Sequence, residues 1–212
     1  NSNYELSLKM LRKLEKINGV TSELAIQRSL IYQELGNEEE ARNVLLELVE
    51  TDSQNIEILD RLVNLLIDQK NNSQALIYNG HIIESFPNDP RGYINSAIIA
   101  MANKNPEEAI KSLSPHIKKF TKNFTFQYLI GTAFYQIKDY DSSLTYLNKA
   151  LQIYPHSKNT KHNLALIYDS IGEWDKSDKL YMELISKDST DAQAYNNYAY
   201  SLVERDENIE FA

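Results

Sequence analysis

The strongest constraint on the fold is a period of 34 residues that runs along the whole sequence. At this spacing, mostly small side chains recur in two columns. The first column contains Ala41, Ala75, Ala109, Ser143 and Ser177, and the second contains Ser29, Val63, Ala97, Gly131, Ala165 and Ala199. A fixed period of about 20–50 residues is typical of stacked repeats, in which each unit buries its apolar face against its neighbours. We therefore expect a repeat array rather than one globular core.

Each repeat divides into two stretches with the period and length of a helix. With Ser22 as the first position, the full repeats are 22–55, 56–89, 90–123, 124–157 and 158–191. Gly36 and Gly172 lie where a first helix should end, and the pair Asn105 and Pro106 suits the start of a second helix. Pro87 and Pro155 lie where second helices should end. These signals predict an all-α fold of about 11–12 helices, since the chain has 212 residues.

Both ends of the chain fall inside a repeat. Residues 4–17 match the second helix of a preceding repeat, and residues 192–212 form a partial sixth repeat with one extra residue in the turn 206–208. Stacked arrays end in polar capping helices. Because neither end has such a cap, we expect Tyr198, Leu202 and Phe211 to be exposed. These uncapped ends could contact another copy of the chain.

Small side chains should bring the two helices of a repeat close together. Ala97, Gly131 and Ala165 leave room for the second helix, while large residues pack around them. One second helix contains a proline, Pro115. Because proline removes a hydrogen bond and crowds the preceding turn, we predict a kink over residues 111–115.

The complete column pattern resembles the tetratricopeptide repeat. Its features are a small residue at position 8, Tyr or Phe at 11, Gly at 15, an aromatic residue at 17, Ala at 20 and Pro at 32. Repeat 124–157 shows Gly131, Phe134, Tyr140, Ser143, Ala150 and Pro155, and repeat 158–191 shows Ala165, Tyr168, Gly172, Trp174 and Ser177. The resemblance covers the whole chain and implies a right-handed superhelical solenoid of antiparallel helix pairs. Val63, Arg28 and His116 depart from the pattern.

The resemblance also implies where a partner would bind. In this family the first helices line a concave face with positions 2, 5, 6, 9, 12 and 13. The candidate peptide-binding residues are therefore Asn64, Ile94, Asn95, Ile98, Met101, Tyr128, Thr132, Tyr135, His162, Asn163, Leu166, Asn197 and Tyr200. Tyrosine offers a large contact area, and asparagine can pair with a peptide backbone. Two interpretations remain open, a peptide groove or ordinary packing beside a solvated wall.

Charge limits the kind of partner. The formal net charge is −8, which argues against nucleic acid and favours an apolar or basic protein or peptide over an acidic one. Some family members bind carboxylates with a clamp of cations and asparagines. Asn64 and Asn95 fit that pattern, but Asp60, Thr125 and Leu129 occupy the places of its cations. We therefore reject the clamp for this chain.

Catalytic signals are weak. The four histidines, His81, His116, His156 and His162, lack metal-site spacing, and the chain has no cysteine. No phosphate-binding loop or nucleophile elbow is present. We predict a non-catalytic scaffold without cofactor or metal. The alternatives are a substrate-selecting arm of a larger enzyme or exported lipoprotein, and a module that assembles end to end.

Location is less constrained by the sequence. No apolar run is long enough to span a membrane, so direct membrane insertion is not expected. The absence of cysteine suits either the cytoplasm or the periplasm. The C-terminal segment resembles the late repeats of bacterial tetratricopeptide proteins, which are often exported, so an association with the outer membrane would require a preceding signal.

Overall fold

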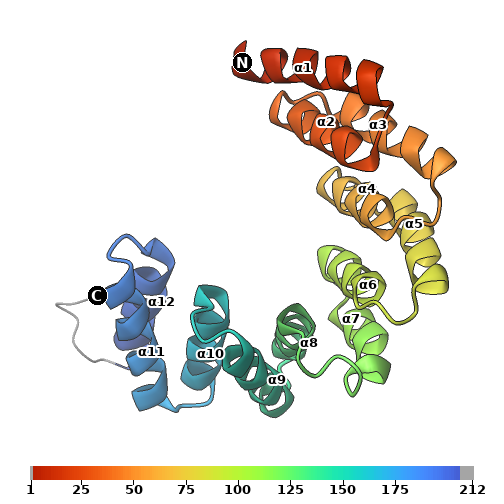
Figure 1. Cartoon of the computed structure of the whole chain (residues 1–212). Helices are drawn as coiled ribbons and strands as arrows, with labels where there is room; N and C mark the ends of the chain where they lie inside the picture. The colour runs from red at the N-terminus through yellow and green to blue at the C-terminus, as the bar shows by residue number, and fades with distance from the viewer. Residues whose placement is uncertain (1, 206–212) are drawn as a thin grey trace. The chain divides into compact units, whose positions relative to one another are not determined.

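The computed structural model describes residues 2–205, and in this range it consists of helices and turns without β-strands (Figure 1). The described helices are α1 (Ser2–Asn18), α2 (Ser22–Glu34), α3 (Glu38–Thr51), α4 (Ile56–Asp68), α5 (Asn72–Ser85), α6 (Arg91–Ala102), α7 (Pro106–Leu113), α8 (Phe124–Gln136), α9 (Tyr140–Ile153), α10 (Lys158–Ser170), α11 (Trp174–Lys187) and α12 (Ala192–Glu204). A short 3₁₀ helix, η1, spans Ser114–His116. The predicted all-α fold is confirmed.

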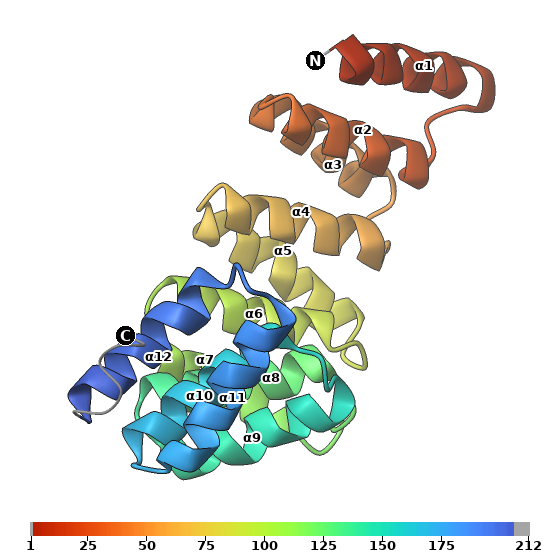
Figure 2. The same cartoon turned by 90° about the vertical axis from the view of Figure 1, so that its left-hand side faces the viewer.

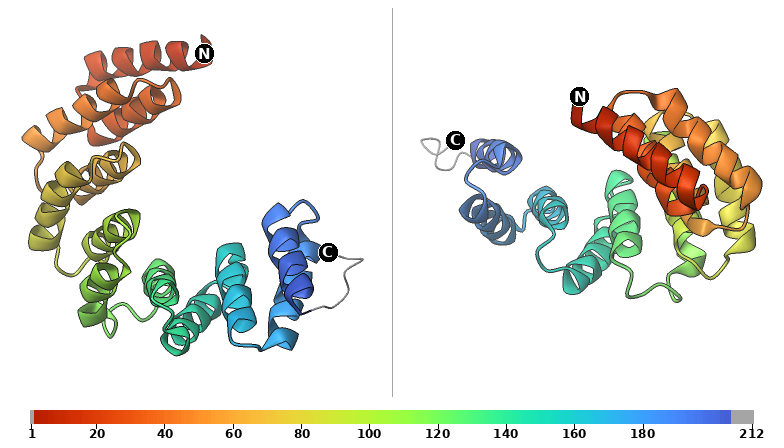
Figure 3. Two further views of the ribbon diagram at one scale, coloured as in Figure 1. Left: turned by 180° about the vertical axis from the view of Figure 1, so that it is seen from behind. Right: turned by 45° about the horizontal axis from the view of Figure 1, so that its top comes forward.

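The chain divides into two compact units, Asn1–Ile99 and Ala100–Ala212, which we call unit 1 and unit 2. In unit 1, α2 packs with α3 and α4 packs with α5, and α1 lies against α2 (Figure 2). In unit 2, α8 packs with α9 and α10 packs with α11, and α12 lies against α11 (Figure 3). Each unit thus has its own series of helix pairs, and α6 runs across the boundary between the units.

A left-handed residue ends the first helix at five turns that lie 34 residues apart. These residues are Gly36, Lys70, Lys104, Lys138 and Gly172, with φ between 57° and 76°. In each turn the next residue donates a backbone hydrogen bond to a carbonyl five residues earlier, as Asp139 does to Phe134 at 3.0 Å. This is the Schellman arrangement, which satisfies carbonyls at a helix end. The glycine positions were predicted, but the lysine positions were not.

The residue after each left-handed position also begins the second helix. The side chains of Asn71, Asn105 and Asp139 each accept a hydrogen bond from a backbone N–H three residues later. Pro106 occupies the first turn of α7, as predicted. One short turn therefore ends one helix and caps the next, which fixes the antiparallel pairing within a repeat.

Small residues let paired helices approach closely. A Cβ atom added to Gly131 would lie 2.8 Å from Cγ of Leu147 and 3.0 Å from its backbone nitrogen. The Ser143 hydroxyl donates to the Gly131 carbonyl at 2.7 Å, and Ser29 donates to Ala41 in the same way at 2.9 Å. The predicted close approach of α8 and α9 at Gly131 is therefore confirmed.

The structure corrects the expectation at Pro115. No bent helix continues through this residue, because α7 ends at Leu113 and the chain turns through η1. Proline has no N–H to donate to Lys111, so the α-helical hydrogen-bond pattern stops one turn early. The second helix of repeat 90–123 is consequently shorter than the other second helices that the structure describes.

The expectation for the C-terminal end was also wrong. Tyr198 and Leu202 are buried, because the face of α12 that bears them packs on Ala165 and Tyr181 of the preceding helix pair. Phe211 lies outside the described residues.

Arg28 has a clear structural role. It forms an ion pair with Glu15 at 3.1 Å and thereby links α2 to α1. This ion pair explains a charged side chain at a position that is usually apolar.

Candidate functional site

The candidate residues lie on the first helices of the predicted repeats, and each unit has its own part of this surface. We call it the first-helix face. In unit 1 it is formed by α2, α4 and α6 up to Ile99. In unit 2 it is formed by α8, α10 and α12, and α10 contacts both of the other helices.

In unit 1, polar side chains of the first-helix face bind one another across repeats. Asn95 donates to the Asp60 carboxylate at 2.8 Å, and Asn64 donates to the backbone carbonyl of Asp60 at 2.8 Å. Burial raises the pKa of Asp60, and the hydrogen bond from Asn95 offsets only part of this effect. Ile94 and Ile98 are half-buried beside these groups. These asparagine amides therefore join or cap helices of the scaffold.

In unit 2, similar hydrogen bonds link α8 to α10 and α10 to α12. Asn163 donates to the Thr132 hydroxyl at 3.1 Å. Ser201 donates to the Asp169 carboxylate at 2.5 Å. Sequence reasoning missed this pairing, although donors and acceptors about one repeat apart, such as Asp60 and Asn95, were a usable signal.

Two candidate residues are buried and do not present a side chain to solvent. Asn95 is 3% exposed and bonded to Asp60. His162 is 2% exposed, and its Nε2 lies 3.0 Å from the Asp191 carboxylate. Both side chains are enclosed because neighbouring repeats stack directly on them. The expectation that they line an open groove was therefore wrong.

Asp191 joins three elements of unit 2. Burial by itself raises the pKa of this carboxyl group, but the backbone N–H of Ala194, together with Lys158 and His162, lowers it further, so the net pKa is below its usual value. Lys158 Nζ lies 3.1 Å from the Asp191 carboxylate and 2.9 Å from that of Asp188. His162 is thus part of the contact between α10 and α12, which is a structural role.

Aromatic side chains give unit 2 its apolar surface. Tyr128 and Tyr135 are half-buried against a cluster of Leu147, Leu164 and Ile167. Tyr128 stacks on Phe124 with ring centroids 5.8 Å apart. Burial, and secondarily Tyr140, raises the pKa of Tyr135.

Other candidates are more accessible. Tyr200 is 63% exposed, whereas Met101, Leu166 and Asn197 are half-buried. A hydrogen bond to Glu204 raises the pKa of Tyr200. The side chain of Asn197 has no hydrogen bond to the part of the chain that the structure describes. Tyr200 and Asn197 are therefore available to a partner, whereas Tyr128 and Tyr135 also support the core.

The remaining histidines are separate from one another. His81 and His156 are exposed, and His116 is half-buried, where burial and then Lys119 lower its pKa. Within residues 2–205 no three His, Asp or Glu side chains are grouped so that they could hold a metal ion. In the same range, no helix has the length and apolar character needed to cross a membrane.

Comparison with known proteins identifies the repeats. Sequence profiles of the tetratricopeptide repeat match residues 22–55 and 126–157. The chain contains tetratricopeptide repeats. No curated protein shows a significant sequence match to this tetratricopeptide chain.

Solved structures show the same solenoid fold. PilF of Pseudomonas aeruginosa matches with a TM-score of 0.75 and 14% identity over 94% of this chain and 90% of its own. A thermophilic tetratricopeptide protein of Thermus thermophilus matches with a TM-score of 0.69 and 16% identity over 86% and 100% of the two chains. YrrB, described as a tetratricopeptide protein with an unusual peptide-binding site, matches with a TM-score of 0.61 and 12% identity over 89% and 97%. At these identities the likeness concerns the fold alone.

Proposed function

We propose that this tetratricopeptide chain is a non-catalytic scaffold that binds a segment of a partner protein on the first-helix face of unit 2. The observation that carries the proposal is the exposed Tyr200 beside the unpaired amide of Asn197 on α12. An aromatic ring provides contact area with few rotatable bonds, and an amide pairs with both groups of a peptide backbone. Together they suit an extended or helical peptide.

Neighbouring side chains support this choice of face. Leu166 on α10 and the tyrosines of α8 continue the half-buried apolar surface. Partner segments with apolar side chains would bury against these groups. The formal net charge of −8 favours neutral or basic segments over acidic ones. The likeness to YrrB adds support, since that protein is described as having a peptide-binding site.

Peptide binding tests the proposal directly. We would measure a library of fluorescent peptides against the wild-type chain and the double variant Asn197→Ala/Tyr200→Ala. We expect at least about tenfold weaker binding of the best peptides by the double variant, because interface tyrosines often contribute more than about 1 kcal/mol. Circular dichroism should show unchanged helix content, since Asn197 and Tyr200 are not core residues.

A tyrosine away from this face provides the control. Tyr4 is 39% exposed on α1, and we expect Tyr4→Ala to leave peptide affinity unchanged. Equal affinity of the wild type and the double variant for every peptide that binds would contradict the proposed site. If the wild-type chain binds none of the peptides, the proposed function itself is wrong.

A further inference from the structure

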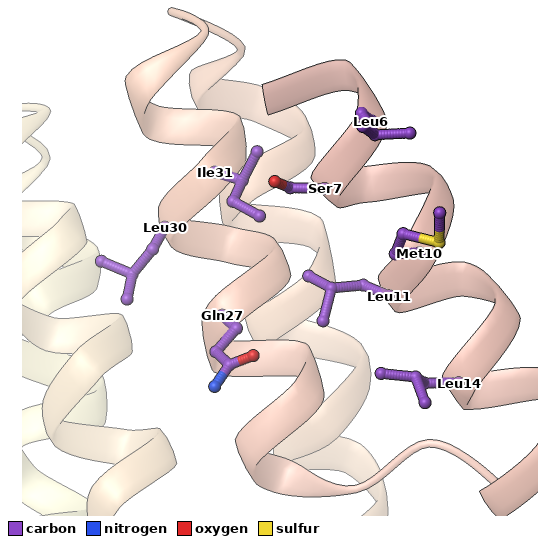
Figure 4. Close-up of a pocket in the computed structure, with 8 residues that line it drawn as sticks. All are labelled: Leu6, Ser7, Met10, Leu11, Leu14, Gln27, Leu30 and Ile31. Carbon is purple, nitrogen blue, oxygen red and sulfur yellow. The ribbon is translucent and has the colours of Figure 1, made fainter. Parts of the chain in front are cut away.

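An apolar groove of about 550 Å³ lies between α1 and α2 in unit 1 (Figure 4). Met10 and Leu14 line it on α1, and they are 48% and 42% exposed. Leu30 on α2 is 41% exposed. Figure 4 shows Ile31 pointing toward α1 and Ser7 pointing toward α2. Large apolar side chains are thus concentrated on a surface that remains open to solvent in this structure.

The same surface one repeat further along is covered by a helix. Val44 and Leu48 follow Met10 and Leu14 by 34 residues, and both are only 7% exposed. They pack with Ala25 of α2, the first helix of the predicted repeat 22–55. The α1–α2 groove therefore has the form of a surface on which a first helix packs.

A first helix with an open face is present at the other end of the chain. Ala199 of α12 is half-buried, whereas Ser29, Gly131 and Ala165 in the same column are buried under second helices. Val203, one turn after Ala199, is 53% exposed. The opposite face of α12 is already packed through Tyr198 and Leu202. Ala199 and Val203 thus form a stripe with the position of a helix-pairing face.

The two ends also carry opposite charge. Residues 1–18 contain four basic and two acidic side chains, although the whole chain has a formal net charge of −8. Residues 192–212 contain four acidic side chains and one basic side chain. Opposite charge favours contact between unlike ends and disfavours contact between like ends.

We propose that α12 of one copy packs into the α1–α2 groove of a second copy and completes a helix pair across two molecules. Ser7 and Ala199 belong to the two columns of small residues, so together they form a small-to-small crossing like that of Ser29 with Ala41. The contact is head-to-tail, and such a contact extends into open chains of molecules unless it closes into a ring. This association goes beyond the proposed peptide binding and uses a different stripe of α12.

Sedimentation equilibrium over a wide range of protein concentration tests this association. We expect the average mass of the wild-type chain to rise with concentration beyond that of a dimer. Met10→Glu and Ala199→Glu should each weaken association at least about tenfold, because each places an unpaired carboxylate in the apolar contact. Both positions are open to solvent, so circular dichroism should show that each variant folds.

Mixing the two variants gives the sharpest result. A Met10→Glu molecule retains an intact α12, and an Ala199→Glu molecule retains an intact groove, so an equimolar mixture should form dimers and no larger species. Met182→Glu is a matched control at a 53% exposed methionine on α11, and it should associate like the wild type. A wild-type chain that stays monomeric at every concentration overturns the proposal. A mixture that associates no better than the separate variants overturns it as well.

Discussion

Three lysines occupy a backbone conformation that suits glycine. Lys70, Lys104 and Lys138 have φ near 60°, at turns where Gly36 and Gly172 fill the corresponding positions. A side chain in this region meets steric hindrance that glycine avoids, at a cost of about 1–2 kcal/mol. The lysines persist because the hydrogen bonds on both sides of the turn fix the backbone. Each turn therefore stores a small amount of strain.

Relieving that strain should stabilise the fold. We expect Lys138→Gly to raise the free energy of unfolding by about 0.5–1 kcal/mol, since the relief exceeds the entropy that glycine adds to the unfolded chain. Urea denaturation measures this change. Lys179→Gly, at an exposed position inside α11, should lower stability by about 1 kcal/mol. Destabilisation by both substitutions would contradict this explanation.

Tyr181 buries its hydroxyl group without a hydrogen-bond partner in the described structure. We expect Tyr181→Phe to leave stability unchanged or to raise it by up to about 1 kcal/mol, because it removes an unpaired polar group. Tyr93 provides a contrast, since its hydroxyl donates to the Pro87 carbonyl at 3.1 Å. Tyr93→Phe should therefore lower stability by about 1 kcal/mol. Thermal unfolding of the two variants decides the point.

The same tyrosine gives a pH dependence. Burial, and then the nearby carboxylate of Asp169, raises the pKa of Tyr181 above its usual value of 10.0. The folded state therefore holds this proton more tightly than the unfolded state does, and stability should fall as the pH rises above about 10. Tyr181→Phe should show a smaller loss over that range. An identical alkaline loss in the wild type and the variant would exclude Tyr181 as its source.

Among the helical elements, two glycines separate close packing from open surface. The close approach of Gly131 to Leu147 leaves no room for a Cβ atom, whereas nothing lies within 4 Å of a Cβ atom added to Gly80 in α5. We expect Gly131→Ala to lower stability by about 1–3 kcal/mol because α8 and α9 must move apart. Gly80→Ala should raise stability by about 0.5–1 kcal/mol through helix propensity. Denaturant titration of both variants tests this opposition of sign, and equal effects would contradict it.

For the molecule as a whole, stacking of repeats predicts local responses to mutation. Leu62 in unit 1 and Leu164 in unit 2 are both buried. Replacing either by alanine should cost about 2–5 kcal/mol. Because each repeat packs only on its neighbours, Leu62→Ala should increase hydrogen exchange in α4 and α5 far more than in α10 and α11. Leu164→Ala should show the reverse, and a uniform increase in both variants would indicate a single cooperative core.

The sequence by itself determined the helices, their order and the small residues at their crossings. These features depend on local signals, such as Gly36, Gly172 and Pro106, and on a period that repeats along the chain. Pro115 was a weaker guide, because sequence indicates that proline disrupts a helix but does not decide between a bend and an end. Here the helix ends at Leu113.

Only the tertiary structure decided which polar side chains remain available to a partner. Periodicity places Asn95, His162 and Asn197 on the first-helix face alike, but Asn95 and His162 are enclosed by hydrogen bonds to the neighbouring repeat. It likewise showed that Tyr198 packs inward while Ala199 remains partly open. A period assigns a residue to a face of its helix, whereas its exposure depends on how closely the next helix packs against that face.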